Sequence, residues 1–387
     1  MRVCEISHTV PPEVFIRRHV EAMRRYSAVD IVLVGRSPAT QPQASLADKR
    51  VPGELLMPNY DHLSLPAKVW NLRYALAGNS WRVRRPLRDR AVLGFFDRLQ
   101  PDLIHFHMAG LAILMRWIPE ALGIPYTVSL RGSDIQVEPV VNDGYRQGLK
   151  DALCRARGIH CVSEDIRRTA EEVTELALPH AKVIYTIAPE HSSERPLARG
   201  IGRRPLLLVT VGRLHWCKGL EYGVVAIAEL RRRGISCRWR VVGEGPCRVQ
   251  IEYAARDEGV HDAIELVGVR PQSWIRDTLA EADVYFHPAV AEGISNAVIE
   301  AMAAGLPVVA TRAGGMDEAI SHGEDGLLVP TRDWRAMARA LEELARDPER
   351  RTRLGGAASG KVRERFSASR HSREFFELYQ GCFQGRR

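Results

Sequence analysis

The sequence lacks any apolar run long enough to cross a membrane. Apolar stretches such as Pro205–Val211 and Leu306–Ala310 have the length of a β-strand, whereas a membrane-spanning helix needs about 20 apolar residues. A glutamate occupies position 5, where a signal peptide would carry its apolar segment. We therefore expect a cytoplasmic protein.

Paired cysteines and closely spaced metal ligands are also missing. The seven cysteines are odd in number and scattered, with no C-x-x-C pair, which argues against both a disulfide framework and a zinc site. His105 and His107 alternate and would share one face of a strand, but no third ligand stands near them in the sequence. We expect no metal ion and no other resident cofactor.

Lysine is scarce, and the excess of basic residues is not concentrated in one part of the chain. Six lysines and 49 arginines stand against 47 acidic residues, which gives a formal net charge of +8. The excess is spread over both halves of the chain without a recognised binding motif, so we expect no nucleic-acid partner. The composition is that of an ordinary globular protein, and 387 residues suffice for two domains.

What the sequence does contain is a repeated alternation of strand and helix patterns. Apolar strands separated by helical spacing are expected at Arg2–Ser7, Asp30–Gly35, Leu103–Phe106, Tyr126–Leu130, Ile159–Val162, Leu206–Val211, Arg238–Val242, Ile264–Leu266, Val284–His287, Val308–Thr311 and Gly326–Val329. Such alternation predicts parallel sheets covered by helices on both faces.

A stretch rich in Pro, Gly, Ser and Arg, residues 188–205, interrupts this alternation. We therefore predict an α/β protein with two doubly wound, Rossmann-like domains, 1–190 and 206–366, joined by a linker at 191–205. Ligands of such sheets bind at the carboxyl ends of the strands, so we expect the functional site in a cleft between the domains.

Four features of the second half fall on strand-to-helix turns. In the first, Gly212 lets the backbone turn after a strand, and Arg213 and Lys218 could converge on one anion across the loop; alternatively, both are solvated loop charges. In the second, Gly243-Glu244-Gly245-Pro246 resembles the start of a dinucleotide-binding fingerprint. Because Arg248 occupies the place of the third glycine, a tight turn is the better interpretation.

The third feature is the most specific. Glu292 precedes a predicted helix that Ser295 or Asn296 would cap, and Glu300 projects from the start of that helix. The free amides of residues 293–296 favour a negative group, and the two carboxylates could accept hydroxyl hydrogen bonds on either side of it. The alternative for Glu300 is a carboxylate that interacts with the helix dipole. The fourth feature is the glycine turn at 314–315, which opens another helix.

Together these motifs resemble glycosyltransferase family 4, the retaining, nucleotide-sugar-dependent enzymes of the GT-B architecture. From Val211 to about Gly355 the chain carries, in the family's order and spacing, G-R-x4-K-G, G-x-G-P, E-x7-E, A-x-G-x-P-V-V-A-T, G-G-x-x-E and D-G-L-L-V-P. The first half resembles the family more loosely, through Pro101–His107, Gly123–Tyr126, Arg131–Asp134 and Cys161–Glu164.

The resemblance implies a role for the charged residues of the motifs. Arg213 and Lys218 would bind the diphosphate of the donor, so that no metal is required. Glu300 would hold the ribose hydroxyls, and Glu292 would contact hydroxyls of the transferred sugar.

The resemblance also assigns backbone contacts and a fold element. The amides around Gly293, Ile294 and Ser295 would help to fix sugar and phosphate, and the nucleobase would lie near Gly243 and Glu244 and the loop at 267–270. Residues 367–387 would form a helix that crosses back to the first domain.

Two positions depart from the pattern. Residues 7–12 replace a glycine-rich loop that many relatives have, and Arg131 stands where many have a histidine that lines the donor sugar. We count Arg131 as a catalytic candidate that could meet a carboxylate or phosphate on donor or acceptor. The alternative is an ion pair with a neighbouring carboxylate such as that of Asp134.

The segment Trp81–Arg98 has six arginines and two aspartates interleaved with apolar residues. Such a helix could rest weakly on an anionic inner membrane surface and reach a lipid-linked acceptor. We favour the commoner arrangement, in which its apolar face packs on the first sheet.

The activity that the resemblance implies is transfer of a hexose-type sugar, with retention, from a nucleoside diphosphate (UDP foremost) to an acceptor hydroxyl in glycan or natural-product biosynthesis. A sugar phosphorylase or synthase-like enzyme and a non-catalytic nucleotide-sugar-binding subunit are the alternatives. A dehydrogenase is disfavoured because neither glycine-rich turn completes the dinucleotide fingerprint.

Overall fold

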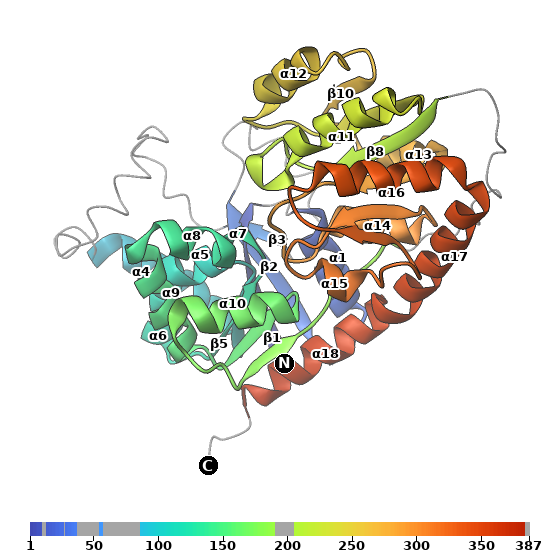
Figure 1. Ribbon diagram of the computed structural model, residues 1–387. Helices are drawn as coiled ribbons and strands as arrows, with labels where there is room; N and C mark the ends of the chain where they lie inside the picture. The colour runs from blue at the N-terminus through green and yellow to red at the C-terminus, as the bar shows by residue number, and fades with distance from the viewer. Residues whose placement is uncertain (10–12, 27, 37–53, 57–85, 190–204, 384–387) are drawn as a thin grey trace. The chain divides into compact units, whose positions relative to one another are not determined.

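The computed structural model describes the chain except for residues 10–12, 27, 37–53, 57–85, 190–204 and 384–387. The chain divides into two compact units, one formed by Met1–Ile187 and Ala368–Arg387 and the other by Ala188–Ser367. Both ends of the chain thus belong to the first unit (Figure 1). Almost all of the predicted linker lies outside the described residues.

The first unit contains a seven-stranded sheet in the order β3-β2-β1-β4-β5-β6-β7, with every pairing parallel. Its strands are β1 (Arg2–Thr9), β2 (Asp30–Arg36), β3 (Glu54–Leu56), β4 (Leu103–Phe106), β5 (Tyr126–Leu130), β6 (Gly158–Cys161) and β7 (Ala181–Val183). Its helices are α1 (Val14–Arg24), α4 (Pro86–Leu99), α5 (Ala109–Met115), α6 (Trp117–Leu122), α7 (Ser133–Gln136), α8 (Glu138–Val141), α9 (Asp143–Arg155), α10 (Glu164–Thr174) and α18 (Ala368–Gly381).

Alternate residues of these strands face opposite sides of the sheet. Val3 and Leu103 belong to the apolar cluster that also contains residues of α1 and α18, whereas Cys4 and Ile104 belong to the cluster on the other side. The face toward α1 and α18 also carries completely buried polar side chains, namely Glu5, His105, Thr127, Ser129 and His160. The first sheet therefore has a polar stripe inside its core.

The second unit contains a six-stranded parallel sheet in the order β10-β9-β8-β11-β12-β13. Its strands are β8 (Leu206–Val211), β9 (Cys237–Val242), β10 (Ile264–Gly268), β11 (Val284–His287), β12 (Val308–Thr311) and β13 (Leu327–Val329). Its helices are η2 (Trp216–Lys218), α11 (Leu220–Arg232), α12 (Arg248–Asp257), α13 (Gln272–Glu281), α14 (Asn296–Ala303), α15 (Met316–Ala319), α16 (Trp334–Arg346) and α17 (Pro348–Arg365).

Each sheet has one place where the order of its strands reverses, between β1 and β4 in the first and between β8 and β11 in the second. The loops that follow two such strands lead to opposite faces of the sheet and leave room for a ligand at its carboxyl edge. In the second unit, these loops are residues 212–219 and 288–295. The fold thus brings the G-R-x4-K-G motif and the first carboxylate of E-x7-E to one edge.

Both sheets, their parallel pairing and the doubly wound order confirm the predicted fold class. The glycine turn at 314–315 opens a helix as expected, but this helix, α15, has only four residues and ends at Ala319 because Ile320 has extended backbone angles. The short edge strands β3 and β7 were not predicted from the sequence.

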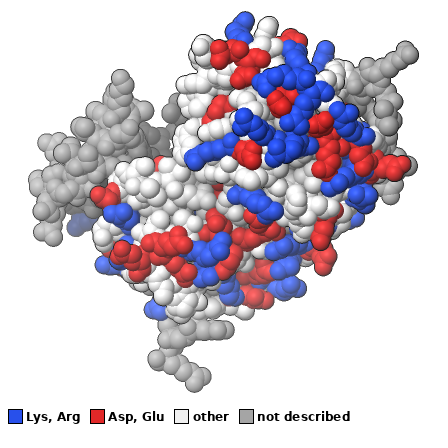
Figure 2. All heavy atoms as spheres, in the orientation of Figure 1, with Lys and Arg blue, Asp and Glu red and all other residues white. Residues whose placement is uncertain are grey.

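The described part of α4 has its apolar side in the core, where Val92 and Phe96 are buried. Within the described ranges, no helix is long and apolar enough to cross a membrane. On the face seen in Figure 2, basic and acidic side chains of the described residues are interspersed.

Candidate functional site

Two glycine turns hold the loops after β8 and β9 against each other. Gly243 has a φ of +136°, and a Cβ at this position would lie 1.9 Å from the carbonyl oxygen of Gly212. The Leu214 amide donates to the carbonyl oxygen of Glu244 at 3.0 Å. Only glycine fits such an approach at a positive φ. The G-R-x4-K-G and G-x-G-P motifs therefore form one continuous edge.

Lys218 and Glu292 meet at the point where the strand order reverses. Lys218 ends η2, and Gly219 then turns the chain into α11 with a φ of +56°. Lys218 Nζ forms an ion pair with Oε1 of Glu292. The two side chains are only 17% and 12% exposed, so this is a mostly buried pair between a predicted diphosphate ligand and a predicted sugar ligand.

His287, the last residue of β11, holds the same carboxylate oxygen from the other side. Its Nε2 donates to Oε1 of Glu292 at 3.1 Å. Its Nδ1 is buried and has no hydrogen-bond partner among the described residues, so the neutral ring carries its proton on Nε2. In the sequence, the only sign of this residue is a polar side chain at the end of an apolar strand, and it was not predicted.

The local charges keep Glu292 ionised. Burial raises the pKa of Glu292, but the Lys218 ammonium and the His287 ring outweigh it and lower that pKa to about 2. Burial lowers the pKa of His287, and the Glu292 carboxylate opposes this only in part. At neutral pH the three side chains are therefore a cation, an anion and a neutral donor.

Arg213 is exposed on the same loop. Burial lowers the pKa of His215, and the positive charges of Arg213 and Lys218 lower that pKa further, so both cations lie near one imidazole. In this structure Lys218 points toward Glu292 instead of sharing an anion with Arg213.

Glu300 lies in the second turn of α14 and is buried, with 8% exposure. Its Oε2 accepts a hydrogen bond from Gln272 of α13 at 3.2 Å, a contact that the sequence did not suggest. Ser295 occupies the predicted N-cap position, although its side chain makes no capping hydrogen bond.

The buried stretch Gly293, Ile294 and Ser295 leads into α14. The carbonyl oxygen of Gly293 accepts from the amide of Gly315 at 2.8 Å. This hydrogen bond joins the fourth predicted feature, the glycine turn, to the E-x7-E loop.

Glu244 is exposed and accepts a hydrogen bond from Arg248 at 2.7 Å. The residue that replaces the third glycine of a dinucleotide fingerprint therefore neutralises the carboxylate in the G-x-G-P turn.

Arg131 follows β5 in the first unit and is held by its neighbours. Its Nε donates to the carbonyl oxygen of His107 at 2.9 Å, and its guanidinium carbon lies 4.5 Å from the centre of the Phe15 ring. Asp134 accepts instead from the backbone amides of Arg131 and Gly132, at 3.2 and 2.7 Å. The carboxylate considered above as an ion-pair partner thus caps its own loop.

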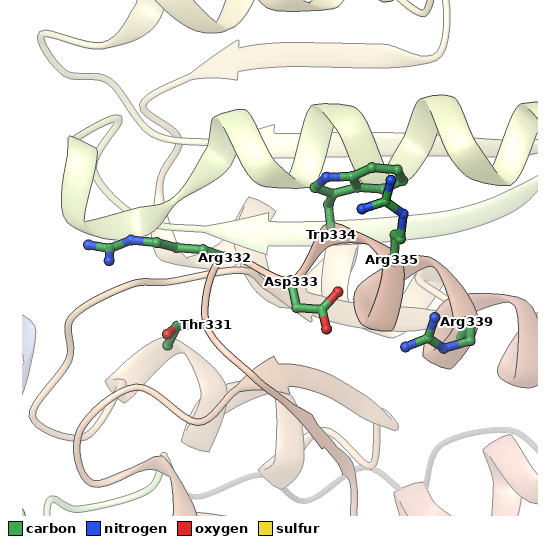
Figure 3. Close-up of a pocket in the computed structure, with 6 residues that line it drawn as sticks. All are labelled: Thr331, Arg332, Asp333, Trp334, Arg335 and Arg339. Atoms are coloured by element: carbon green, nitrogen blue, oxygen red, sulfur yellow. The ribbon is translucent and has the colours of Figure 1, made fainter.

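A hollow of about 430 Å³ lies where β13 leads into α16 (Figure 3), and its lining contains Arg332, Trp334 and Arg339. No predicted site residue lines it. Asp333 caps α16, and the Arg335 guanidinium lies 4.1 Å from the Trp334 ring centre. Local structure accounts for Asp333, Trp334 and Arg335, and no predicted site residue lines the hollow, so we do not assign it to the site.

In the described part of the chain, one group of side chains is close enough to suggest a metal site. Ligand atoms of Glu5, His19 and His107 all lie within 4.8 Å of one another. The rings of His105 and His107 do lie together, with centres 4.8 Å apart. The two other members of the metal-like group, Glu5 and His19, come from β1 and α1. Both are far from His107 in the sequence, so spacing alone could not predict that they meet. Hydrogen bonds already join Glu5 to both of its histidines.

Comparison with known proteins extends these observations. Residues 12–186 match the family description "Glycosyl transferase 4-like domain", and residues 205–347 match "Glycosyl transferases group 1". The WcaL glycosyltransferase of Salmonella typhimurium, named for colanic acid biosynthesis, is 33% identical over 46% of this chain and 45% of its own length. The alpha-D-kanosaminyltransferase of Streptomyces kanamyceticus is 30% identical over 78% of this chain and 81% of its own length.

The chain therefore spans about half the length of the first relative and about four fifths of the second. Among solved structures, Anabaena HepE in complex with UDP has a TM-score of 0.74 at 16% identity, over 98% of this chain and all of that one. This likeness supports the GT-B architecture. The motifs, the fold and the matches over both units lead to one conclusion: the chain belongs to glycosyltransferase family 4.

Proposed function

We propose that the chain is a retaining glycosyltransferase that moves a hexose-type sugar from a UDP-sugar to an acceptor hydroxyl. Family membership supports sugar transfer, and the UDP in the HepE structure supports the choice of carrier. One relative is named for colanic acid biosynthesis and another for transfer of a kanosaminyl group. We therefore expect the acceptor among glycans and glycosylated natural products.

One observation carries the proposal, namely the placement of Lys218, Glu292 and His287 beside the paired glycine turns. A diphosphate needs fixed positive charge, and a sugar needs acceptors for its hydroxyl protons. Lys218 supplies the first and Glu292 the second, and they lie in contact where a doubly wound sheet binds ligands.

The reaction breaks the bond between C1 of the sugar and the diphosphate oxygen and forms a bond from C1 to the acceptor oxygen. Negative charge grows on the leaving diphosphate, where Lys218, Arg213 and the amides before α14 would stabilise it. A preorganised group of this kind contributes about 3–4 kcal/mol to lowering a barrier. With retention, the acceptor attacks on the face from which the diphosphate leaves, and the leaving phosphate takes its proton.

Lys218 changes partner in this scheme. The donor diphosphate draws the ammonium away from Glu292, and His287 keeps the carboxylate in place for the sugar hydroxyls. Arg131 would supply a further positive charge toward donor or acceptor from the first unit.

Binding and turnover of UDP-sugars test the assignment. UDP should raise the melting temperature more than ADP or GDP does. Glu300→Gln should weaken UDP binding about tenfold through loss of a charged hydrogen bond. Glu292→Gln should bind UDP normally and turn over donor at least about 100-fold more slowly. Glu265→Gln, at a half-exposed glutamate paired with Arg240, is the matched control. Parent-like behaviour of both site variants would refute the site.

The stereochemistry has its own test, which needs no known acceptor. Slow hydrolysis of an α-linked UDP-sugar should release the α-anomer first, as seen by NMR before the anomers equilibrate. Initial release of the β-anomer would refute retention and leave the donor site unaffected.

A further inference from the structure

Glu300, the residue expected to hold the ribose hydroxyls, has a hydrogen-bond partner that belongs to none of the motifs. Gln272 is the first residue of α13, and its Nε2 donates to Oε2 of Glu300 at 3.2 Å. The two residues are 28 positions apart in the chain, so only the packing of α13 near α14 brings them together. Because a carboxylate accepts hydrogen bonds and donates none, the amide of Gln272 must present its NH₂ group here.

The backbone at Gln272 is fixed by its surroundings. Pro271 precedes it with extended backbone angles, and the carbonyl oxygen of Pro271 accepts from the amide of Ile275 at 3.1 Å. One side of α13 is buried, since Ile275, Thr278 and Leu279 are at most 9% exposed, and the helix contacts β8. The side chain of Gln272 therefore extends from an anchored first turn.

The backbone at Glu300 is equally well anchored, but its carboxylate needs a further constraint. The neighbouring α14 residues Val298, Ile299, Ala301 and Met302 are at most 1% exposed. A glutamate side chain still has several rotatable bonds, so a fixed helix does not by itself set the direction of the carboxylate. The hydrogen bond from Gln272 supplies a constraint on that direction.

Gln272 orients the carboxylate without neutralising it. The other predicted sugar ligand, Glu292, is paired with the cation Lys218, whereas the amide of Gln272 carries no net charge. Hydrogen bonds to an ionised acceptor are about twice as strong as those between neutral groups. A carboxylate offers about four lone-pair sites, so accepting from Gln272 is compatible with accepting from ligand hydroxyls.

We propose that Gln272 is a positioning residue that aims the Glu300 carboxylate at the adjacent 2′- and 3′-hydroxyls of ribose, and that it thereby favours ribonucleotide donors over 2′-deoxyribonucleotides. A site that hydrogen-bonds a hydroxyl group discriminates against a ligand that lacks it, because the buried acceptor then loses a partner. The discrimination is greatest when the acceptor is held in place before the ligand arrives. This inference rests on the role proposed for Glu300 in donor binding.

The simpler role for the contact is helix packing. If Gln272 only joined α13 to α14, its loss would weaken the binding of every nucleotide at this site by the same factor. If Gln272 aims Glu300, its loss acts mainly on ligands that carry the 2′-hydroxyl. The ratio of the affinities for UDP and 2′-deoxy-UDP therefore distinguishes the two roles.

Calorimetric titration of the full chain measures this ratio. The parent should bind UDP about 10–100-fold more tightly than 2′-deoxy-UDP, through a hydrogen bond to a charged group. Gln272→Ala should reduce that preference about three- to tenfold, mainly by weakening the binding of UDP. An equal loss of affinity for the two nucleotides would overturn the proposal in favour of packing.

A variant of nearly the same shape tests whether the donated hydrogen bond matters. Gln272→Glu keeps the size of the side chain but replaces its NH₂ group by a second carboxylate oxygen. At about pH 8, where both carboxylates are expected to be ionised, repulsion should turn Glu300 away. The preference for UDP should then fall at least as far as in Gln272→Ala. A preference equal to that of the parent would contradict the proposal.

The first unit contains a matched control for the loss of an amide–carboxylate hydrogen bond. Gln136 Nε2 donates to Oδ2 of Asp165 at 3.3 Å, and this contact is also partly buried. Gln136→Ala should change both nucleotide affinities by less than about twofold, because it lies outside the donor loops. A loss of preference as large as that in Gln272→Ala would show that the effect is not specific to Glu300, and would overturn the proposal.

Kinetics provide a readout that a general loss of structure would not give. In a UDP-sugar hydrolysis assay, Gln272→Ala should raise KM about three- to tenfold and change kcat less than about threefold, because ribose contacts are similar in the ground and transition states. A fall in kcat with unchanged KM would contradict the positioning role.

Glu300→Gln separates this inference from the function on which it rests. It should lower the preference for UDP about tenfold. If Glu300→Gln has this effect and the Gln272 variants do not, the donor site stands and the positioning role is wrong. If Glu300→Gln leaves the preference unchanged, the assignment of Glu300 to ribose is wrong, and the role of Gln272 fails with it.

Discussion

Glu292 shows how much of a site depends on contacts that no motif contains. Its carboxylate would repel a diphosphate if it stood alone, yet here it is balanced by Lys218 and held by His287. The lysine that neutralises Glu292 is the same group that the donor needs. In this structure Lys218 neutralises Glu292, so a bound diphosphate would compete with Glu292 for the Lys218 ammonium.

This exchange of partners predicts the behaviour of Lys218→Met. Donor turnover should fall by a factor of about 100–1000, because a preorganised cation is lost from the leaving group. The chain offers a matched control in Lys361, which is equally exposed at 17% and pairs with the buried Asp325 at 2.9 Å. Lys361→Met also leaves a buried carboxylate unpaired and should cost stability, but it should keep parent turnover in a UDP-sugar hydrolysis assay. Equal loss of turnover in both variants would mean that stability alone explains the effect.

The pKa of Glu292 predicts how stability depends on pH. The folded value of about 2 lies below the ordinary value of 4.5, so the carboxylate contributes stability above about pH 5. This contribution should disappear as the pH falls from about 5 to about 2. Urea unfolding over this range should show a smaller decline in Glu292→Gln than in the parent. An unchanged decline would mean that Glu292 is not the group that titrates.

The sequence places Lys218 and Glu292 on turns that follow strands, and in the structure these turns bring the two side chains into contact. Their role in binding a donor stays a prediction. His287 and Gln272 were missed because their roles depend on which strand or helix packs beside them. The partners of Arg131 were missed for the same reason: His107 and Phe15 are distant in the chain and meet it only through the sheet.

At the scale of elements, the turn before α11 depends on one glycine. Gly219 and Gly259 have similar positive φ values, +56° and +67°. A Cβ at Gly219 would lie 2.3 Å from the carbonyl oxygen of Pro288, whereas one at Gly259 would meet nothing within 4 Å. Alanine at either position must adopt a positive φ, but only alanine at Gly219 would also clash with the backbone. Comparing the two substitutions therefore distinguishes the cost of backbone strain from the cost of a steric clash.

We predict that Gly259→Ala lowers the free energy of unfolding by about 1 kcal/mol, because alanine is less stable than glycine in the left-handed backbone conformation. Gly219→Ala should cost at least about 2 kcal/mol more, because the backbone must shift. It should also weaken UDP binding, since Lys218 moves with the turn. Chemical denaturation and calorimetric titration measure both effects. Equal stability losses would show that the loop relaxes without strain.

The bounds of some strands were predicted correctly from the sequence, whereas other strands were not predicted at all. Strands such as β4, β5, β8, β11 and β12 begin and end where expected, because a fully buried parallel strand is a short apolar run with polar ends. Edge strands β3 and β7 have only three residues each and little pattern. Helix α15 is short because the chain leaves the helix at Ile320 and residues 321–326 form backbone hydrogen bonds among themselves.

At the scale of the molecule, the two doubly wound units follow from the alternation of strands and helices. The polar stripe inside the first sheet does not. Glu5, His105 and His160 stand in strands that read as apolar. His105 and His160 are hydrogen-bonded to Thr127, Ser129 and the carbonyl oxygen of Ile184, within the first unit. For Glu5, the return of α18 supplies one of its hydrogen-bond partners, Tyr379, and α1 supplies another, His19.

The packing of α18 with the first unit can be tested by finding which strands become less protected when a core residue of α18 is mutated. Phe375 of α18 is fully buried in the first unit, and Leu341 of α16 is fully buried in the second. Phe375→Ala should cost about 3–5 kcal/mol and Leu341→Ala about 2–5 kcal/mol. Because α18 packs with the first unit, Phe375→Ala should speed amide exchange in β1 and β4–β6 and leave β8–β13 protected, whereas Leu341→Ala should do the reverse. Faster exchange in β8–β13 with Phe375→Ala would mean that α18 folds with the unit that precedes it in the chain.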